Sequence, residues 1–361
     1  MDRITGFKFV IAATLALSLS TFSISPGVSA ADSSRSQPKN VAPAQSAQFA
    51  RSECQSQSPQ SVAFIADAPY VHGNAVLWQP PVDIECRDLF YGPGGRENAP
   101  DPSMPFTYVR RSKSGTQKKI IVQDVNGDKW TVKFGPEARP ETAATRIVWA
   151  VGYHVDQDYF VQRAQIVGTK NIDARDVRFE RHEGKYKEIG NWSWEDNPFV
   201  GTRELEGLRV LMALLKNWDL KEANNDILTP KKNPGPDIYY VADLGASLGR
   251  TGTFLNSLHG NAPGTVSFSP GKSKGDPYSF TRERFIKEVR EDRVYFTMRH
   301  LKSRRRVDGV SVESARWMGS WLGRLSDKQL SDAFCASGYS PAETALYVSI
   351  LRARIIELQR L

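Results

Sequence analysis

Two acidic residues, a lysine and an asparagine lie near one another in the second half of the sequence. Asp219, Lys221 and Asn224 follow a predicted helix, and Asp243-Leu244-Gly245 comes directly after a short apolar stretch. A loop carboxylate can orient an attacking hydroxyl group, and a lysine can neutralise charge on a phosphoryl group. An amide oxygen and a second carboxylate are ligands suited to Mg²⁺. The pattern predicts phosphoryl transfer, with Asp219 and Lys221 as catalytic residues and Asn224 and Asp243 as metal ligands.

A second set of residues has the types needed to bind a nucleotide. Lys133 lies on a predicted strand and points opposite to Val132 and Phe134, so it can contact phosphate groups as a point charge. Glu141, at the start of the next predicted helix, is its expected partner, and Glu137 is a rival. A favourable charge at a helix N-terminus explains Glu141 equally well.

A turn at residues 114–119 is a further candidate for phosphate binding. Its sequence Ser-Gly-Thr-Gln-Lys-Lys includes Gly115 and Lys118. Such a turn exposes backbone N–H groups that can hold phosphate oxygens, and Lys118 adds positive charge. An ordinary hairpin turn explains the same residues.

The elements that must position these residues follow from the pattern of apolar residues. Alternating apolar residues predict strands, and Asn126-Gly127 predicts a hairpin turn. Apolar residues spaced by three and four predict helices, with Thr202 capping the one that leads to Asp219. The predicted strands are 106–109, 119–125, 129–134, 159–167, 177–181 and 237–242, and the predicted helices are 140–151, 202–218, 281–291, 312–322, 326–337 and 341–360.

This order predicts an α+β, two-lobed, kinase-like fold. The β-rich N-lobe is expected at residues 106–200 and the mainly helical C-lobe at residues 201–361. Within the C-lobe, Ser326 with Gln329 and Ser340 with Glu343 fit the capping-box pattern at helix starts.

The chain resembles the atypical kinases, a group that includes the bacterial HipA-type kinases and the phosphatidylinositol 3- and 4-kinases. The turn Gly115-Thr116-Gln117-x-Lys119 is similar to the HipA-type Gly-Ala-Gln-Pro-Lys loop, and Asp219-x-x-x-x-Asn224 and Asp243 match the loop and metal-binding residues of that superfamily. The resemblance covers roughly residues 106–249. It implies a phosphotransferase that uses ATP and Mg²⁺, with Lys133 contacting the phosphates.

The chain also departs from the pattern of these kinases. Leu220 follows Asp219 where Arg is usual, Trp218 stands where a His would precede it, and no ordinary kinase Gly-rich loop is present. The resemblance therefore extends to the nucleotide and metal, and the acceptor stays open between protein, lipid and sugar.

The N-terminal region predicts export. Residues 1–30 combine Arg3 and Lys8, an apolar run and a small-residue site for cleavage after Ala30, as in a secretory signal peptide; an uncleaved anchor is the alternative. Residues 31–61 are expected to be a flexible linker and residues 62–105 an irregular extension. The mature protein is expected to be secreted or periplasmic, with no transmembrane span.

Cysteine content and charge add further expectations. In an oxidising compartment Cys54 and Cys86 can form a bridge, whereas Cys335 is expected to be a buried thiol. The formal net charge is +8, yet no basic stripe is interleaved with aromatic residues, so nucleic acid is not an expected partner. The basic cluster at residues 299–306 is expected to be a solvated loop; an acidic peptide, a lipid head group and a nucleotide are its alternative ligands.

Three functions fit these observations. The first is an exported kinase-like phosphotransferase that binds a nucleotide. The second is a secreted pseudokinase that keeps the fold as a binding or scaffold protein. The third is a cell-envelope interaction protein in which the motif matches are accidental.

Overall fold

The computed structural model describes residues 71–112, 118–169, 171–182, 184–249, 275–282, 284–298 and 300–361. All of them belong to the compact unit Gln57–Leu361. The predicted signal peptide, the linker, Cys54 and Gly115 lie outside the described residues.

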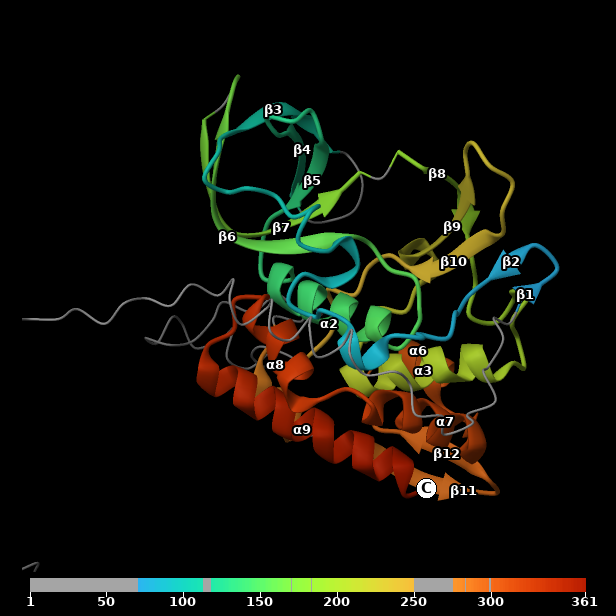
Figure 1. Ribbon diagram of the computed structural model, residues 1–361. Coiled ribbons are helices and arrows are strands. Elements are labelled where there is room, and N and C mark those ends of the chain that lie inside the picture. Colours follow the sequence, from blue (N-terminus) through green and yellow to red (C-terminus); the bar gives the residue numbers. More distant parts are fainter. Residues whose placement is uncertain are drawn as a thin grey trace, which may run out of the picture. The chain divides into compact units, whose positions relative to one another are not determined.

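The first large element is a closed barrel of five strands in the order β3-β4-β5-β7-β6 (Figure 1). A parallel pairing of β3 with β6 closes it, and the other neighbours are antiparallel. As predicted, β4 and β5 form a hairpin in which Gly127 has φ 89°. Trp130, Val132 and Phe179 lie in the barrel interior, so the alternate residues of β5 are available for other contacts. The strands are β3 (Phe106–Arg111), β4 (Lys119–Gln123), β5 (Lys129–Lys133), β6 (Asp158–Val167) and β7 (Ile172–Arg181).

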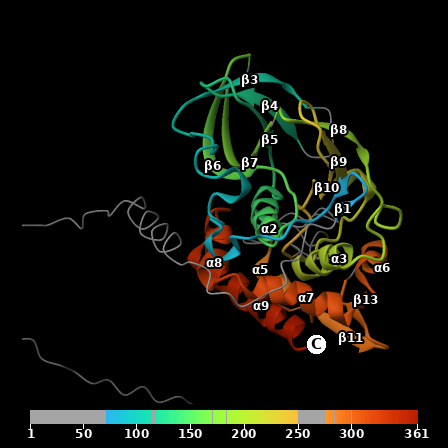
Figure 2. The same cartoon turned by 45° about the vertical axis from the view of Figure 1, so that its right-hand side comes forward.

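The helix that follows β5 is α2 (Ala138–Ala150), as the sequence predicts. Its apolar stripe, which includes Ala144, Ile147 and Val148, is buried. The helix contacts β6 and β7 of the barrel on one side and α8 (Asp327–Cys335) on another. Figure 2 shows α2 below the barrel and above the C-terminal helices. The first turn of α2 is therefore held close to the end of β5.

A second sheet has the strand order β1-β2-β10-β9-β8. Only β10 (Asp237–Val241) was predicted from the sequence. It pairs with β9 (Asn225–Pro230), which in turn pairs with β8 (Tyr186–Asn191). On its other side β10 pairs in parallel with β2 (Ala75–Val76), which forms a hairpin with β1 (Val71–His72). The segment between α3 (Arg203–Leu215) and β9 contains Asp219 and Asn224.

Helices dominate the C-terminal part. Thr202 caps α3 as predicted, because its side chain accepts a hydrogen bond from the Leu205 backbone N–H. Both predicted capping boxes, at Ser326 and Ser340, are confirmed. The helices of this part are α3 (Arg203–Leu215), α5 (Pro277–Thr281), α6 (Leu301–Val307), α7 (Val312–Gly323), α8 and α9 (Pro341–Gln359); short 3₁₀ turns are η1 (Ile84–Cys86), η2 (Gly92–Gly94) and η3 (Glu222–Asn224).

The predicted helix at residues 281–291 is wrong. After α5, the chain forms β11 (Ile286–Arg290), which pairs with β12 (Arg293–Phe296) and, through it, with β13 (Val310–Ser311). Glu291 and Asp292 have φ values of 49° and 60°, which form a tight hairpin turn that a helix cannot contain. The two cross-strand ladders outweigh the local preference of Glu and Lys for a helix.

Three further features bear on the predictions. No helix in the described part of the chain is long and apolar enough to cross a membrane. Cys86 is disulfide-bonded. Cys335 is a free thiol at the C-terminal end of α8. It is exposed, so the expectation of a buried thiol was wrong.

Candidate active site

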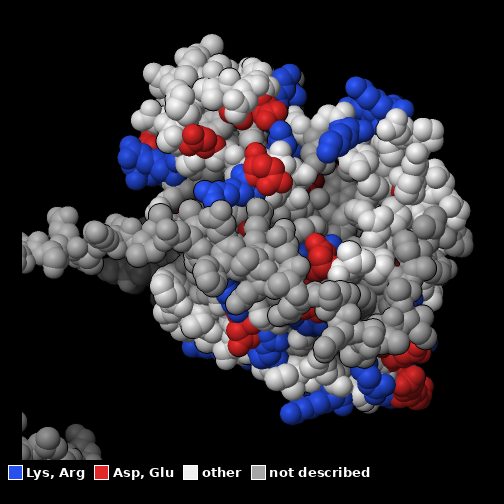
Figure 3. All heavy atoms as spheres, viewed as in Figure 1, with Lys and Arg blue, Asp and Glu red and all other residues white. Residues whose placement is uncertain are grey.

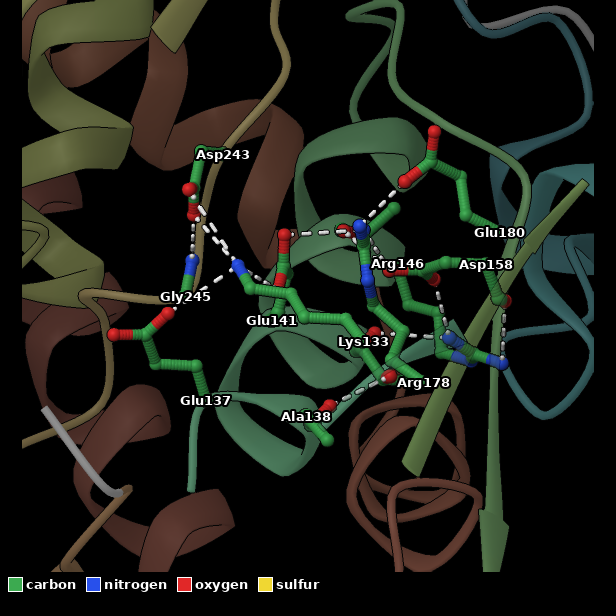
Figure 4. A network of polar contacts seen from close by, with 12 residues as sticks. Lys133, Glu137, Ala138, Glu141, Arg146, Asp158, Arg178, Glu180, Asp243 and Gly245 are labelled. Carbon is green, nitrogen blue, oxygen red and sulfur yellow. Dashed lines mark hydrogen bonds and ion pairs between the residues drawn. The ribbon is translucent and has the colours of Figure 1, made fainter. Parts of the chain in front are cut away.

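Lys133 is the central cation of a buried polar cluster (Figure 4). It is the last residue of β5, and only 1% of its side chain is exposed. Its Nζ lies 2.8 Å from Glu141 Oε2 and 3.3 Å from Glu137 Oε2, so both sequence candidates contact it. Because α2 begins directly after β5, its first turn brings both carboxylates to the lysine.

A third carboxylate reaches Lys133 from a distant part of the chain. Asp243 follows β10, and its Oδ1 lies 3.4 Å from Lys133 Nζ. The Gly245 N–H donates to the same oxygen at 3.0 Å. A Cβ on Gly245 would lie 3.0 Å from the Cβ of Glu137, so the close approach of these two segments favours glycine. The Asp243 side chain is 34% exposed, which leaves part of the carboxylate open to a ligand.

A network behind Glu141 fixes its position. Arg178 on β7 places Nη1 3.0 Å from Glu141 Oε1 and 3.3 Å from Asp158 Oδ2. Asp158 also pairs with Arg146 of α2 at 3.2 Å. This network was not predicted from the sequence, where its only signal is the presence of charged residues within predicted strands and the α2 stripe.

Burial and charge act in opposite directions on these groups. Burial raises the pKa of Glu141 to about 7, although Arg178 and Lys133 act to lower it. Burial also acts to raise the pKa of Asp243, but Lys133 and the Gly245 amide outweigh it, so this pKa lies below its usual range. Burial disfavours the charged form of Lys133, yet Glu141 and Asp243 more than offset this effect and raise its pKa. Lys133 and Asp243 are therefore held as ions at neutral pH.

The loop that carries Asp219 is fixed mainly by its backbone. The helix α3 ends at Leu215, and Lys216 adopts a left-handed conformation with φ 58° that turns the chain. The Asp219 N–H donates to Asn217 Oδ1 at 3.1 Å, and Asn224 Nδ2 donates to the Asp219 carbonyl oxygen at 2.7 Å. Lys221 Nζ lies 2.9 Å from Asp219 Oδ2. These contacts join the three predicted loop residues into one unit.

Backbone hydrogen bonds connect this loop to the segment that carries Asp243. The Ala242 N–H donates to the Asn224 carbonyl oxygen at 2.8 Å, and the Trp218 N–H donates to the Ala246 carbonyl oxygen at 3.4 Å. Asp243 lies between these two connections and also contacts Lys133. The structure thus brings Lys133, Glu141 and Asp243 into direct contact and connects the Asp219–Asn224 loop to them through the backbone.

The predicted phosphate-binding turn is only partly described. Lys118 Nζ lies 4.4 Å from the centre of the Phe134 ring, a cation–π contact, whereas Gly115 is outside the described residues. Lys119 lies opposite Lys133 on β4 and helps to lower the pKa of Asp243. Lys119, the last residue of the predicted turn, is thus a basic residue near the site.

The donor atoms of the site fit a hard divalent cation. The carboxylates of Glu137 and Asp243 lie beside the ammonium of Lys133, whereas Glu141 is also paired with Arg178. Because Asn224 uses its amide nitrogen toward Asp219, its amide oxygen is the atom suited to a metal, and oxygen ligands are those Mg²⁺ prefers. Within the described ranges, no group of three or more His, Cys, Asp or Glu is arranged to hold a metal ion. Asn224 and Asp243 would therefore need phosphate oxygens or water to complete the coordination.

No family model matches the chain, and no curated protein matches it. Among solved structures, it is similar to the proinflammatory kinase CtkA of Helicobacter pylori, with 12% identity and a TM-score of 0.41 over 71% of this chain and 97% of that chain. It is also similar to the Golgi casein kinase, with 9% identity and a TM-score of 0.37 over 91% and 92% of the two chains. A third is the Rio2 kinase-ADP/Mg²⁺-phosphoaspartate complex of Chaetomium thermophilum, with 15% identity and a TM-score of 0.29 over 72% and 73%.

These similar structures are kinases, and the described part of this chain has a mixed α and β fold. The likeness concerns the fold alone. The narrower resemblance to HipA-type and phosphatidylinositol kinases stays a prediction.

Proposed function

We propose that this protein is a two-lobed, kinase-like phosphotransferase that uses ATP and Mg²⁺. The observation that carries this proposal is the contact of Lys133 with Glu141 on one side and Asp243 on the other. A lysine held by a helix carboxylate, next to a carboxylate on a connected loop, is the arrangement that positions nucleotide phosphates in phosphoryl transfer.

Each residue has a role that follows from its surroundings. Glu141, fixed by Arg178, orients the Lys133 ammonium, which contacts the phosphates. Asp219 accepts a hydrogen bond from the acceptor hydroxyl and orients it, and Lys221, paired with Asp219, neutralises charge on the transferred group. The Asn224 amide and the Asp243 carboxylate would hold Mg²⁺, and this ion would neutralise negative charge on the phosphate oxygens.

The first test measures nucleotide binding and transfer separately. We expect calorimetry to show that the purified mature protein binds ATP only when Mg²⁺ is present. The Asp243→Asn variant should lose this Mg²⁺-dependent binding. Asp173→Asn, an exposed carboxylate on β7 that pairs with Arg163 and Arg175, is the matched control and should bind as the unaltered protein does. Absence of Mg²⁺-dependent nucleotide binding would overturn the proposal.

Transfer distinguishes an active enzyme from a pseudokinase. Radiolabelled ATP should label an acceptor or the protein itself, and Asp219→Asn should remove the label while leaving nucleotide binding intact. Binding without any transfer would instead assign the protein to the pseudokinase alternative.

We also propose that the protein is exported and that residues 1–30 are removed. The disulfide-bonded state of Cys86 supports an oxidising compartment. N-terminal sequencing of the protein recovered outside the cytoplasm should begin at Ala31. Recovery of the intact N-terminus in a membrane fraction would favour the uncleaved anchor.

A further inference from the structure

The basic cluster that follows Met298 forms a short helix rather than a solvated loop. Four of the seven residues of α6 are Lys or Arg, and its sequence contains no acidic residue. On the face of the molecule seen in Figure 3, basic and acidic side chains are intermixed except for one basic patch at the upper right. The helix therefore concentrates positive charge, and its position relative to the Asp219 loop determines whether that charge can bear on the proposed site.

Two side chains of α6 bind the loop that carries Asp219. Ser303 Oγ donates a hydrogen bond to the Trp218 carbonyl oxygen, and Arg306 Nη1 donates one to the Leu220 carbonyl oxygen. These carbonyl groups belong to the residues on either side of Asp219. In both views α6 lies beside α3, the helix that delivers the loop (Figures 1 and 2). The helix thus borders the part of the site where an acceptor hydroxyl must lie.

The cations of α6 differ in how they are used. Arg306 Nε lies 2.8 Å from Glu195 Oε1, and Arg304 lies 3.8 Å from Asp308. Lys302 and Arg305 are exposed, and being three residues apart on a helix they are neighbours on its surface. Arg306 therefore fixes the helix to the loop, while Lys302 and Arg305 present charge to the solvent.

We propose that α6 is a docking surface for an acidic polypeptide, with Lys302 and Arg305 binding carboxylates that flank the acceptor residue. This inference rests on the proposed function and names the acceptor class. Two adjacent exposed cations match one or two carboxylates on an extended chain. An anionic membrane is usually recognised by clusters of about four to eight basic residues. Of the four in α6, Arg304 and Arg306 are paired with carboxylates, which leaves Lys302 and Arg305 to a ligand.

The test compares peptide binding with transfer. The double variant Lys302→Glu/Arg305→Glu reverses the charge of the surface without touching Asp219, Asn224, Asp243 or Lys133. The control Arg163→Glu/Lys328→Glu reverses two exposed charges on β6 and α8. The probes are two labelled peptides with one central serine, flanked by glutamate in one and by glycine and serine in the other.

We expect the unaltered protein to bind the glutamate peptide at least ten times more tightly by fluorescence anisotropy, and the α6 variant to lose that preference. The control variant should keep it, and all three proteins should bind ATP with Mg²⁺ equally. In transfer assays, the α6 variant should raise KM for the glutamate peptide with little change in kcat. Peptide anisotropy needs no transfer. If the unaltered protein prefers the glutamate peptide but does not bind ATP, the proposed function is contradicted while the docking surface is supported.

Two outcomes would overturn the docking surface. One is equal binding of both peptides by the unaltered protein. The other is binding of phosphatidylserine vesicles that is lost in the α6 variant, without any preference between peptides, which would assign the surface to a membrane.

Discussion

The Lys133 cluster and the Asp219 loop hold their functional side chains in contrasting ways. Lys133 is buried and is fixed by ion pairs to three carboxylates, with Arg178 behind them. Asp219 is 30% exposed, and the loop around it is fixed through backbone groups by Asn217, Asn224 and α6. The structure of the Lys133 cluster therefore depends on its ion pairs. The structure of the Asp219 loop depends on backbone hydrogen bonds and does not require the charge of the Asp219 carboxylate.

This difference separates stability from chemistry. A buried ion that loses its partner leaves an uncompensated charge, which is costly. An exposed ion pair contributes little to stability. Substitutions in the Lys133 cluster should therefore alter folding and binding together, while substitutions of the Asp219 carboxylate should alter transfer alone.

The largest effect on stability is expected for Lys133→Met. Removing the ammonium leaves Glu141 and Asp243 without their common partner, so the free energy of unfolding should fall by about 3–5 kcal/mol. Urea denaturation measures it. The matched control is Lys129→Met, an exposed lysine on the same strand, for which a change below about 0.5 kcal/mol is expected. An equal loss in both variants would remove the contrast between the two regions.

Asp219→Asn should show the opposite behaviour. Loss of the carboxylate that orients the acceptor hydroxyl should lower the transfer rate by about 10²–10⁴-fold, while the free energy of unfolding changes by less than about 0.5 kcal/mol. Glu222→Gln, an exposed carboxylate in the same loop, should leave both quantities unchanged. If Asp219→Asn unfolds the protein as readily as Lys133→Met, the carboxylate is structural.

The pH dependence of stability tests the charge state of the Lys133 cluster. The pKa of Glu141 is raised from 4.5 to about 7, so the folded protein keeps a proton that the unfolded chain releases. The stabilisation from this group is present below pH 4.5 and is lost as the pH rises through about 7. Its size is up to about 3 kcal/mol, at about 1.4 kcal/mol per pKa unit.

Glu141→Gln isolates that contribution because glutamine does not titrate. The free energy of unfolding of the unaltered protein minus that of the variant should decrease between pH 4.5 and 8 in urea titrations. Asp226 also has a raised pKa, but burial, Glu188 and Glu180 cause that shift, so its contribution is the same in both proteins and cancels in the difference. A difference that increases with pH would mean that Lys133 and Arg178 keep Glu141 ionised.

What the sequence predicted, and what it missed, follows from the range of the interactions. The hairpin at Asn126-Gly127, the cap at Thr202 and the capping boxes depend on neighbouring residues, so they were predicted correctly. The contact of Glu141 with Arg178 depends on the pairing of β7 with β5, which joins segments distant in the sequence, and no local pattern signals it. The contact of α6 with the Asp219 loop likewise joins segments distant in the sequence, and so do the strand pairs that replaced the predicted helix at residues 281–291.

An intermediate effect on stability is expected for Asn224→Ala, which bears on both regions because the loop and the Asp243 segment meet at this residue. The substitution removes the hydrogen bond from Asn224 Nδ2 to the Asp219 carbonyl oxygen and should cost about 1 kcal/mol of unfolding free energy. Asn197→Ala is a control outside the site: Asn197 Nδ2 donates to the Ser193 carbonyl oxygen at 2.8 Å, and its Oδ1 accepts from the Phe199 N–H at 2.8 Å. Both variants should lose stability in urea, but only Asn224→Ala should raise the Mg²⁺ concentration needed for half-maximal ATP binding, by about tenfold if one ligand is worth about 1.4 kcal/mol. An unchanged Mg²⁺ requirement would reduce Asn224 to a residue that shapes the loop and would leave Asp243 as the single metal-binding side chain of the proposed site.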